Sequence, residues 1–100
     1  MDKINIKEME VEKQLDYEDI VVKLYKVPVK HRCNRNIVGE NQQGEVVWQI
    51  DDVLPNQDSP FVNINPYSNE KIKASNWIGV DYYVYISDGR IELLPNQRPW

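Results

Sequence analysis

Apolar and polar residues alternate with a period of two along most of this 100-residue chain. Successive side chains of a β-strand point to opposite faces, so this alternation is typical of strands that bury one face. No window keeps the i, i+3, i+4, i+7 spacing of an amphipathic helix. We therefore expect a mostly β protein.

The N-terminal part contains two predicted strands. The first spans residues 3–12, with a β-bulge near Lys7 and Glu8, where the alternation slips. The segment EKQLDYED at 12–19 contains good helix formers, but it is too short to be stable as a helix alone, so we interpret it as a connection. The second strand, IVVKLYKV at 20–27, is rich in β-branched and aromatic residues and ends at Pro28.

Three β-hairpins are predicted in the rest of the chain. They are formed by the runs 35–40 and 45–51, 61–65 and 71–78, and 80–87 and 90–94. The first hairpin turns through NQQG, whose glycine can adopt the left-handed conformation that closes a hairpin. The last turns through Asp88-Gly89, for which a two-residue type I′ turn is expected. Residues 53–60 are predicted to form a loop, and 96–100 a tail.

These elements predict a single all-β domain over residues 1–100. One open sheet of this size would leave an apolar face uncovered, and no helix is available to cover it. We expect a small antiparallel β-sandwich or a curled meander built from consecutive hairpins, with little or no helix. The expected core consists of Ile37, Val46, Trp48, Ile50, Val62, Ile64, Ile72, Ala74, Tyr82, Val84 and Ile86.

The composition places the chain among ordered, globular proteins, because 41% of its residues are hydrophobic and 28% are charged. The start of the chain lacks the pattern of a signal peptide, and no apolar run is long enough to span a bilayer. The single cysteine, Cys33, cannot form an intramolecular disulfide. We expect a complete cytosolic protein without a membrane partner.

Charge is distributed unevenly along the chain. Residues 20–35 contain basic but no acidic side chains, whereas residues 36–70 contain acidic but no basic ones. The strands can fold these blocks side by side as paired, solvated faces, or the second block can form an acidic patch that recruits a basic partner. The net charge of −4 argues against nucleic acid as the partner.

Catalytic and metal-binding patterns are weak. His31 and Cys33 are two residues apart and would share a face of a strand, so a thiolate–imidazole pair is conceivable, but no further histidine exists to build a metal site. Asp51 and Asp52 are adjacent and would point to opposite faces. The chain has no Gly-rich phosphate loop and no nucleophile elbow. We expect a protein that is not an enzyme and needs neither cofactor nor metal.

Aromatic residues mark a candidate binding surface. In VDYYVYIS at 80–87, Tyr83 and Tyr85 lie on the face opposite to Tyr82 and Val84. Together with Trp77 they can form an anchor patch, since tyrosine and tryptophan are enriched in interfaces. The alternative is a central strand with both faces covered. The sequence SNWIG also breaks the alternation and predicts a β-bulge at 76–79.

Two stretches, RNIVGENQQGEVVWQI at 35–50 and IKASNWIGVDYYVYISDGRI at 72–91, resemble the repeats of PQQ-type β-propellers. The chain has residues for two blades at most, so this resemblance implies no cofactor. The patterns RNI, GEVVWQI and NWIG are more similar to small stand-alone bacterial β proteins of the kind found as immunity proteins in contact-dependent and polymorphic toxin systems. That resemblance implies a cytosolic, acidic, non-catalytic protein that binds one cognate toxin domain, often a basic nuclease, and blocks its active site.

Three functional hypotheses follow. In the leading one, an immunity-type inhibitor, Asp51, Asp52 and Asp58 contact a basic toxin surface, while Trp77, Tyr83 or Tyr85 supply packing. The second is a module that binds a small ligand or a peptide in an enclosed apolar pocket. The third is an enzyme that uses His31 and Cys33.

Overall fold

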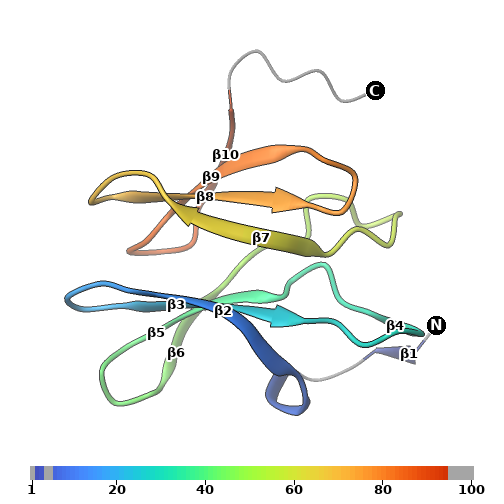
Figure 1. Cartoon of the computed structure of the whole chain (residues 1–100), viewed down its shortest axis with the longest axis horizontal. Coiled ribbons are helices and arrows are strands. Elements are labelled where there is room, and N and C mark those ends of the chain that lie inside the picture. Colours follow the sequence, from blue (N-terminus) through green and yellow to red (C-terminus); the bar gives the residue numbers. More distant parts are fainter. Residues whose placement is uncertain (1, 4–5, 95–100) are drawn as a thin grey trace.

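Two four-stranded antiparallel sheets form the protein, stacked as two layers (Figure 1). The computed structural model describes residues 2–3 and 6–94. The first sheet has the order β2-β3-β5-β6, with bounds Glu10–Asp16, Val21–Lys26, Ile37–Glu40 and Val46–Gln49. The second has the order β10-β9-β8-β7, with bounds Ile91–Leu93, Asp81–Tyr85, Lys71–Asn76 and Phe61–Pro66. This confirms an all-β sandwich, and the described residues include no α-helix.

The N-terminal segment differs from the prediction. A short parallel pair joins β1 (Asp2–Lys3) to β4 (His31–Arg32), and a 3-10 turn at Ile6–Glu8 replaces the expected β-bulge before β2. The predicted connection at 12–19 was wrong for residues 12–16, which belong to β2, whereas residues 17–19 do connect β2 to β3. Pairing with β3, including Leu15 opposite Val22, satisfies the backbone of this segment and overrides its weak helix propensity.

All three predicted hairpins are present, but the turn of the last one differs from the prediction. Tyr85 N donates to Arg90 O (2.9 Å) and Gly89 N to Tyr85 O (2.8 Å), so the last hairpin has a four-residue connection rather than a type I′ turn. Gly89 is left-handed (φ 75°), and Asp88 is not. The predicted β-bulge at 76–79 is a tight turn between β8 and β9 that Gly79 closes with a φ of 87°.

The inner faces of the two sheets form one hydrophobic core. It contains Val22, Leu24, Ile37, Trp48 and Ile50 from the first sheet and its edge, and Phe61, Ile64, Ile72, Ala74, Val80, Tyr82, Val84 and Ile86 from the second. Every predicted core residue is buried except Val46 and Val62, which are 47% and 41% exposed. Both lie at register shifts, where an extra residue interrupts the alternation on which the prediction depended.

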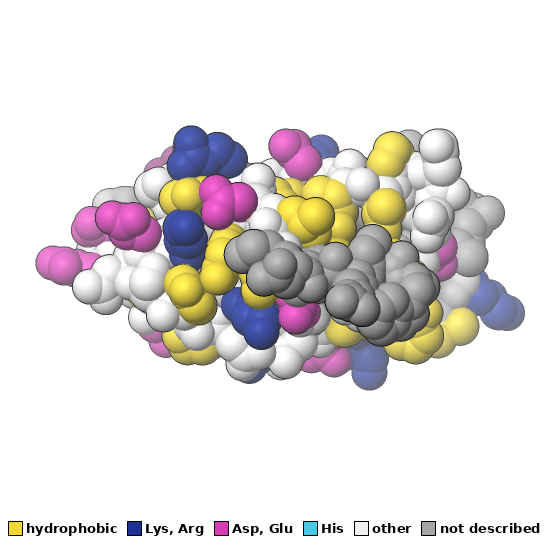
Figure 2. All heavy atoms as spheres, turned by 90° about the horizontal axis from the view of Figure 1, so that it is seen from above, with side chains coloured by type: hydrophobic (Ala, Val, Ile, Leu, Met, Phe, Trp, Pro, Cys, Tyr) yellow, Lys and Arg dark blue, Asp and Glu magenta, His cyan; other side chains and the backbone are white. Residues whose placement is uncertain are grey.

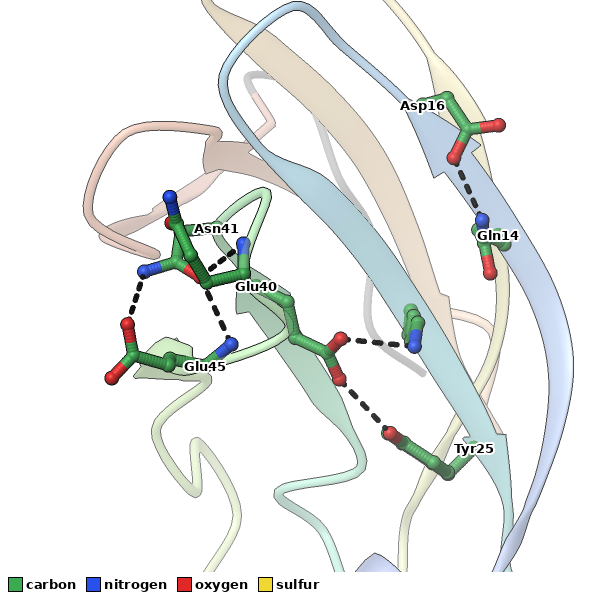
Figure 3. Close-up of polar contacts among 8 residues, drawn as sticks. Gln14, Asp16, Tyr25, Glu40, Asn41 and Glu45 are labelled. Atoms are coloured by element: carbon green, nitrogen blue, oxygen red, sulfur yellow. Dashed lines mark hydrogen bonds and ion pairs between the residues drawn. The ribbon is translucent and has the colours of Figure 1, made fainter.

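Polar contacts order the first sheet at its β3–β5–β6 side (Figure 3). Glu40 pairs with Lys23 (2.9 Å), so one ion pair joins the basic and acidic blocks across neighbouring strands. Asn41 Oδ1 accepts hydrogen bonds from Gln43 N (3.0 Å) and Glu45 N (2.9 Å), which closes the turn into β6. The paired-face interpretation of the charge blocks is therefore correct for Lys23 and Glu40.

Candidate binding groove

A groove lies between the β8–β9 turn, the β3–β4 connection and the β6–β7 connection. Figure 1 shows these three backbone segments at the same end of the sandwich. Its volume is about 330 Å³. We call it the Trp77 groove; its lining residues are Val27, Pro28, Val29, Lys30, His31, Asp58, Pro60 and Trp77. The groove thus brings together segments that lie far apart in the sequence.

Trp77 lies at the tip of the β8–β9 turn. The turn is fixed by backbone donors: Asn76 N bonds Val80 O (3.1 Å), Trp77 N bonds Pro60 O (2.9 Å) and Gly79 N bonds Asn76 O (3.0 Å). Val80 N donates to Asn76 Oδ1 (2.9 Å). Small polar residues usually occupy such tips, yet Trp77 is 72% exposed and its neighbour Ile78 is also exposed. A rigid backbone therefore presents an apolar anchor to solvent.

The facing wall belongs to the β3–β4 connection. Val29 at its tip is 88% exposed. Lys30 has a φ of 74°, which makes it the one left-handed residue other than glycine in the described part of the chain. Such a conformation costs about 1–3 kcal/mol and persists only where the surrounding structure enforces it. His31 follows directly, and its Nδ1 is buried without a hydrogen-bond partner.

The third wall, residues 58–60, is held in place by two buried asparagines. Asn34 Nδ2 donates to Leu54 O (3.0 Å) and Gln57 O (2.7 Å), and its Oδ1 accepts from Ser59 N (2.8 Å). Asn36 makes equivalent contacts two residues later. Its Nδ2 donates to Tyr25 O and Phe61 O (2.8 Å each), and its Oδ1 accepts from Phe61 N (2.9 Å). These two side chains position the loop that carries Asp58.

Unpaired buried polar atoms gather around this groove. Of the four unpaired atoms within residues 6–94, three lie at or next to the groove: His31 Nδ1, Ser59 Oγ and Asn76 Nδ2; the fourth is the Tyr17 hydroxyl. His31 lines the groove, and Ser59 and Asn76 are chain neighbours of lining residues. Leaving such a group unpaired costs about 1–3 kcal/mol. Unpaired polar atoms, backbone strain and an exposed tryptophan all oppose stability, and departures of this kind concentrate at functional sites.

Comparison with known proteins identifies the family. The chain matches the family described as "Domain of unknown function (DUF7957)" over residues 2–94. It belongs to the DUF7957 family. No curated protein and no solved structure matches the chain.

The DUF7957 domain places the six predicted site residues in two regions. Asp58 and Trp77 both line the Trp77 groove. Asp51 and Asp52 are exposed in the same β6–β7 connection, but the Asp52 carboxylate accepts hydrogen bonds from Asn34 Nδ2 (3.0 Å) and Leu54 N (3.1 Å) and so has a structural role. The remaining two residues, the tyrosines of β9, are on the outer face of the second sheet.

This outer surface of the domain, which we call the tyrosine face, consists of Tyr67, Lys71, Tyr83, Tyr85 and Arg90. The rings of Tyr67 and Tyr83 are 4.6 Å apart. The Lys71 ammonium lies 4.7 Å from the Tyr83 ring and 5.0 Å from the Tyr85 ring, and the Arg90 guanidinium lies 4.0 Å from the Tyr85 ring. Figure 2 shows hydrophobic, basic and acidic side chains mixed on the face seen from above. Charged side chains thus partly cover the tyrosines, while Trp77 lies in the groove.

His31 and Cys33 belong to different environments. His31 lines the groove, whereas Cys33 packs against a small apolar cluster of Met9, Tyr25 and Val38. Burial raises the pKa of the Cys33 thiol, which keeps it protonated and poorly nucleophilic at neutral pH. Among the described residues, no three or more His, Cys, Asp and Glu side chains come together as a candidate metal site.

A larger cleft of about 700 Å³ lies between the β2–β3, β7–β8 and β9–β10 turns. We call it the acidic cleft; it is lined by Tyr17, Glu18, Asp19, Ile20, Asn69, Glu70, Tyr85, Ile86 and Ser87. The Tyr17 hydroxyl is buried there without a partner, and burial raises its pKa. Sequence reasoning missed this cleft, because its residues come from three turns whose proximity depends on sheet stacking.

Sequence reasoning also missed the groove residues Val29 and Lys30, and the two asparagines beneath them. No spacing rule marks a left-handed lysine. Asn34 and Asn36 are four and two residues before Val38, so an extended chain places them on the same face as this buried residue. That position was the available signal for two buried asparagines.

None of the residues that the structure describes forms a helix with the length and apolar character needed to cross a membrane.

Proposed function

We propose that the DUF7957 domain is a non-catalytic binding protein of the immunity type, which inhibits a cognate, basic toxin domain by covering its active site. The Trp77 groove is the contact surface. The observation that carries this proposal is the exposed indole of Trp77, held on a hydrogen-bonded turn beside the Asp58 carboxylate.

The indole can supply most of the binding energy. A large aromatic side chain buries about 150–250 Å² in an interface. At about 25 cal/mol per Å², this corresponds to roughly 4–6 kcal/mol before ordering costs. Those costs are small here, because the turn is already fixed by its own hydrogen bonds. Tryptophans in this position are typical binding hot spots.

Charge around the groove orients the partner. The β6–β7 connection carries Asp51, Asp52 and Asp58, and the Arg32 guanidinium, which donates to Pro55 O and Gln57 O, offsets part of their charge. Asp58 lines the groove and takes part in none of the ion pairs among the described residues, so its carboxylate can pair with a basic partner. Lys30 lies on the facing wall and gives the groove opposite charges on its two sides. We expect association to be faster at low salt, whereas the buried indole sets the lifetime of the complex.

Affinity capture from the producing cells tests the proposal. The tagged protein, its Trp77→Ala variant and a Tyr67→Ala control are used as baits at low and high salt. Tyr67 is a matched control because it is also an exposed aromatic residue (58%) but lies on the tyrosine face. We expect one stoichiometric basic protein with the wild type and the control, lost with Trp77→Ala and weakened by salt.

The captured protein must then behave as a toxin. Expressed alone it should arrest growth, and co-expression with the wild type, but not with Trp77→Ala, should restore growth. If the partner is harmless alone, the immunity assignment fails although binding stands. If Tyr67→Ala rather than Trp77→Ala abolishes binding of the partner, the contact lies on the tyrosine face and the groove assignment fails.

The second candidate function is binding of a small ligand or a peptide, and the acidic cleft favours it. Its volume of about 700 Å³ lies within the range of small-molecule sites. Ile20 and Ile86 provide apolar walls, and the Tyr17 hydroxyl is an unpaired polar group. Two results would favour this function instead. The capture column would be empty, and a cationic ligand would raise the unfolding temperature of the wild type but not that of Glu70→Lys.

A further inference from the structure

The four sheet edges of the sandwich differ in how they are protected. An exposed edge strand can pair with another chain, and proteins prevent this with charges, proline, short strands or β-bulges. β2 carries several charged residues, and its Lys13 Nζ reaches across to Asn63 Oδ1 (3.3 Å) and Asn65 Oδ1 (2.9 Å) on β7. β7 also ends in Pro66. β10 has three residues, and its Glu92 pairs with Lys71 (3.6 Å).

β6 lacks the charges and the proline that protect the other edges. Its sequence, VVWQ, contains no charge and no proline. Val46 and Val47 are 47% and 49% exposed. β6 is the last strand of its sheet, so within the described residues no strand pairs with its outer side (Figure 1). Two protective features remain: β6 has only four residues, and the register shift opposite Glu40 interrupts its ladder.

The strand is also rigid. Asn41 fixes its start, as described above. Trp48 Nε1 donates to Ile86 O (2.8 Å) in the other sheet, and Gln49 Nε2 donates to Arg35 O (2.8 Å). An added strand would therefore meet an edge that needs no further ordering.

We infer that β6 is a self-association edge, on which a second copy of this chain adds its own β6 in antiparallel orientation. Pairing about Val47 places Val47 opposite Val47 and Val46 opposite Trp48. Glu45 then lies opposite Gln49, so no like charges face each other. A strand that is complementary to itself fits the twofold symmetry of a homodimer. Two four-stranded sheets would join into one continuous sheet.

This dimer is independent of the proposed function, since β6 shares no residue with the Trp77 groove. The two interactions also respond differently to salt. Two chains of net charge −4 repel each other, so salt should strengthen the dimer, whereas it should weaken binding of a basic partner. Because the paired strands are short, we expect the dimer only toward high protein concentration.

Sedimentation equilibrium of the purified protein over a wide concentration range, at low and high salt, tests this inference. The variants are Val47→Lys and the matched control Val11→Lys. Val11 is a similarly exposed edge valine (44%) on the protected strand β2. Circular dichroism and thermal unfolding of both variants verify that they fold. We expect the wild type and Val11→Lys each to form a homodimer that salt strengthens. We expect Val47→Lys to remain monomeric under all conditions.

A wild type that remains monomeric at every concentration and salt would overturn the inference. So would loss of the dimer in Val11→Lys but not in Val47→Lys, which would assign pairing to β2. A Trp77→Ala variant should dimerise like the wild type, so failure of the groove proposal and failure of this one are distinguishable.

Discussion

The contact between Trp48 and Gly39 yields a sharp prediction about stability. The indole of Trp48 lies directly over Gly39, its neighbour on β5, and a methyl group at position 39 would lie 2.2 Å from Nε1 and 2.3 Å from Cε2. The ring cannot move away freely. Gly89 also lies against the ring, since a methyl group there would be 2.5 Å from Cε3. Gly39→Ala must therefore displace Trp48.

The magnitude follows from what the displacement disrupts. Overpacking a core position costs about 1–3 kcal/mol. Moving the indole also breaks the bond from Nε1 to Ile86 O (2.8 Å), and a buried partner left unpaired costs about 1–3 kcal/mol. We expect Gly39→Ala to lower the free energy of unfolding by about 2–6 kcal/mol. For a domain with about 5–15 kcal/mol of stability, this is a large fraction.

Urea denaturation followed by far-UV circular dichroism measures the effect. Gly44→Ala is the control: Gly44 has open space around it and a φ of 79°, so alanine there meets conformational strain of about 1–2 kcal/mol but no clash. A Trp48→Phe background completes a double-mutant cycle, because phenylalanine lacks the atoms nearest to position 39. The reasoning is refuted if Gly39→Ala costs no more than Gly44→Ala, or if its cost is unchanged in Trp48→Phe.

Two further predictions concern buried polar groups. Asn36→Ala removes three hydrogen bonds to Tyr25 and Phe61, so buried backbone groups lose their partners. We expect it to lower the free energy of unfolding by about 2–4 kcal/mol in the same urea assay. An effect smaller than that of a surface Gln42→Ala control would contradict the bridging role of Asn36. Burial raises the pKa of the Cys33 thiol, so its rate of alkylation by iodoacetamide at pH 8 should be well below that of free cysteine and should increase above that pH. Urea should abolish the difference, and a native rate equal to that of free cysteine would argue against burial.

Local patterns in the sequence were sufficient for most of the fold. Alternation and glycine-containing turns predicted the hairpins correctly, because hairpin strands are neighbours in the chain and depend on few distant contacts. The same alternation identified most of the core, including Trp48. It failed at Val46 and Val62, because a β-bulge changes the face of a residue without any signal in composition.

The sequence by itself determined the all-β character and the hairpins, and it named Asp58 and Trp77 among six candidate binding residues. Only the tertiary structure decided that Asp58 and Trp77 line the same groove, while Tyr83 and Tyr85 lie on another face. Trp77 lies on a turn of the second sheet, and Asp58 lies on the connection between the sheets, which Asn34 and Asn36 hold in place. Their proximity depends on how two sheets stack and on where buried asparagines bond a passing loop. Neither follows from the period of the chain, because both are contacts between residues far apart in sequence.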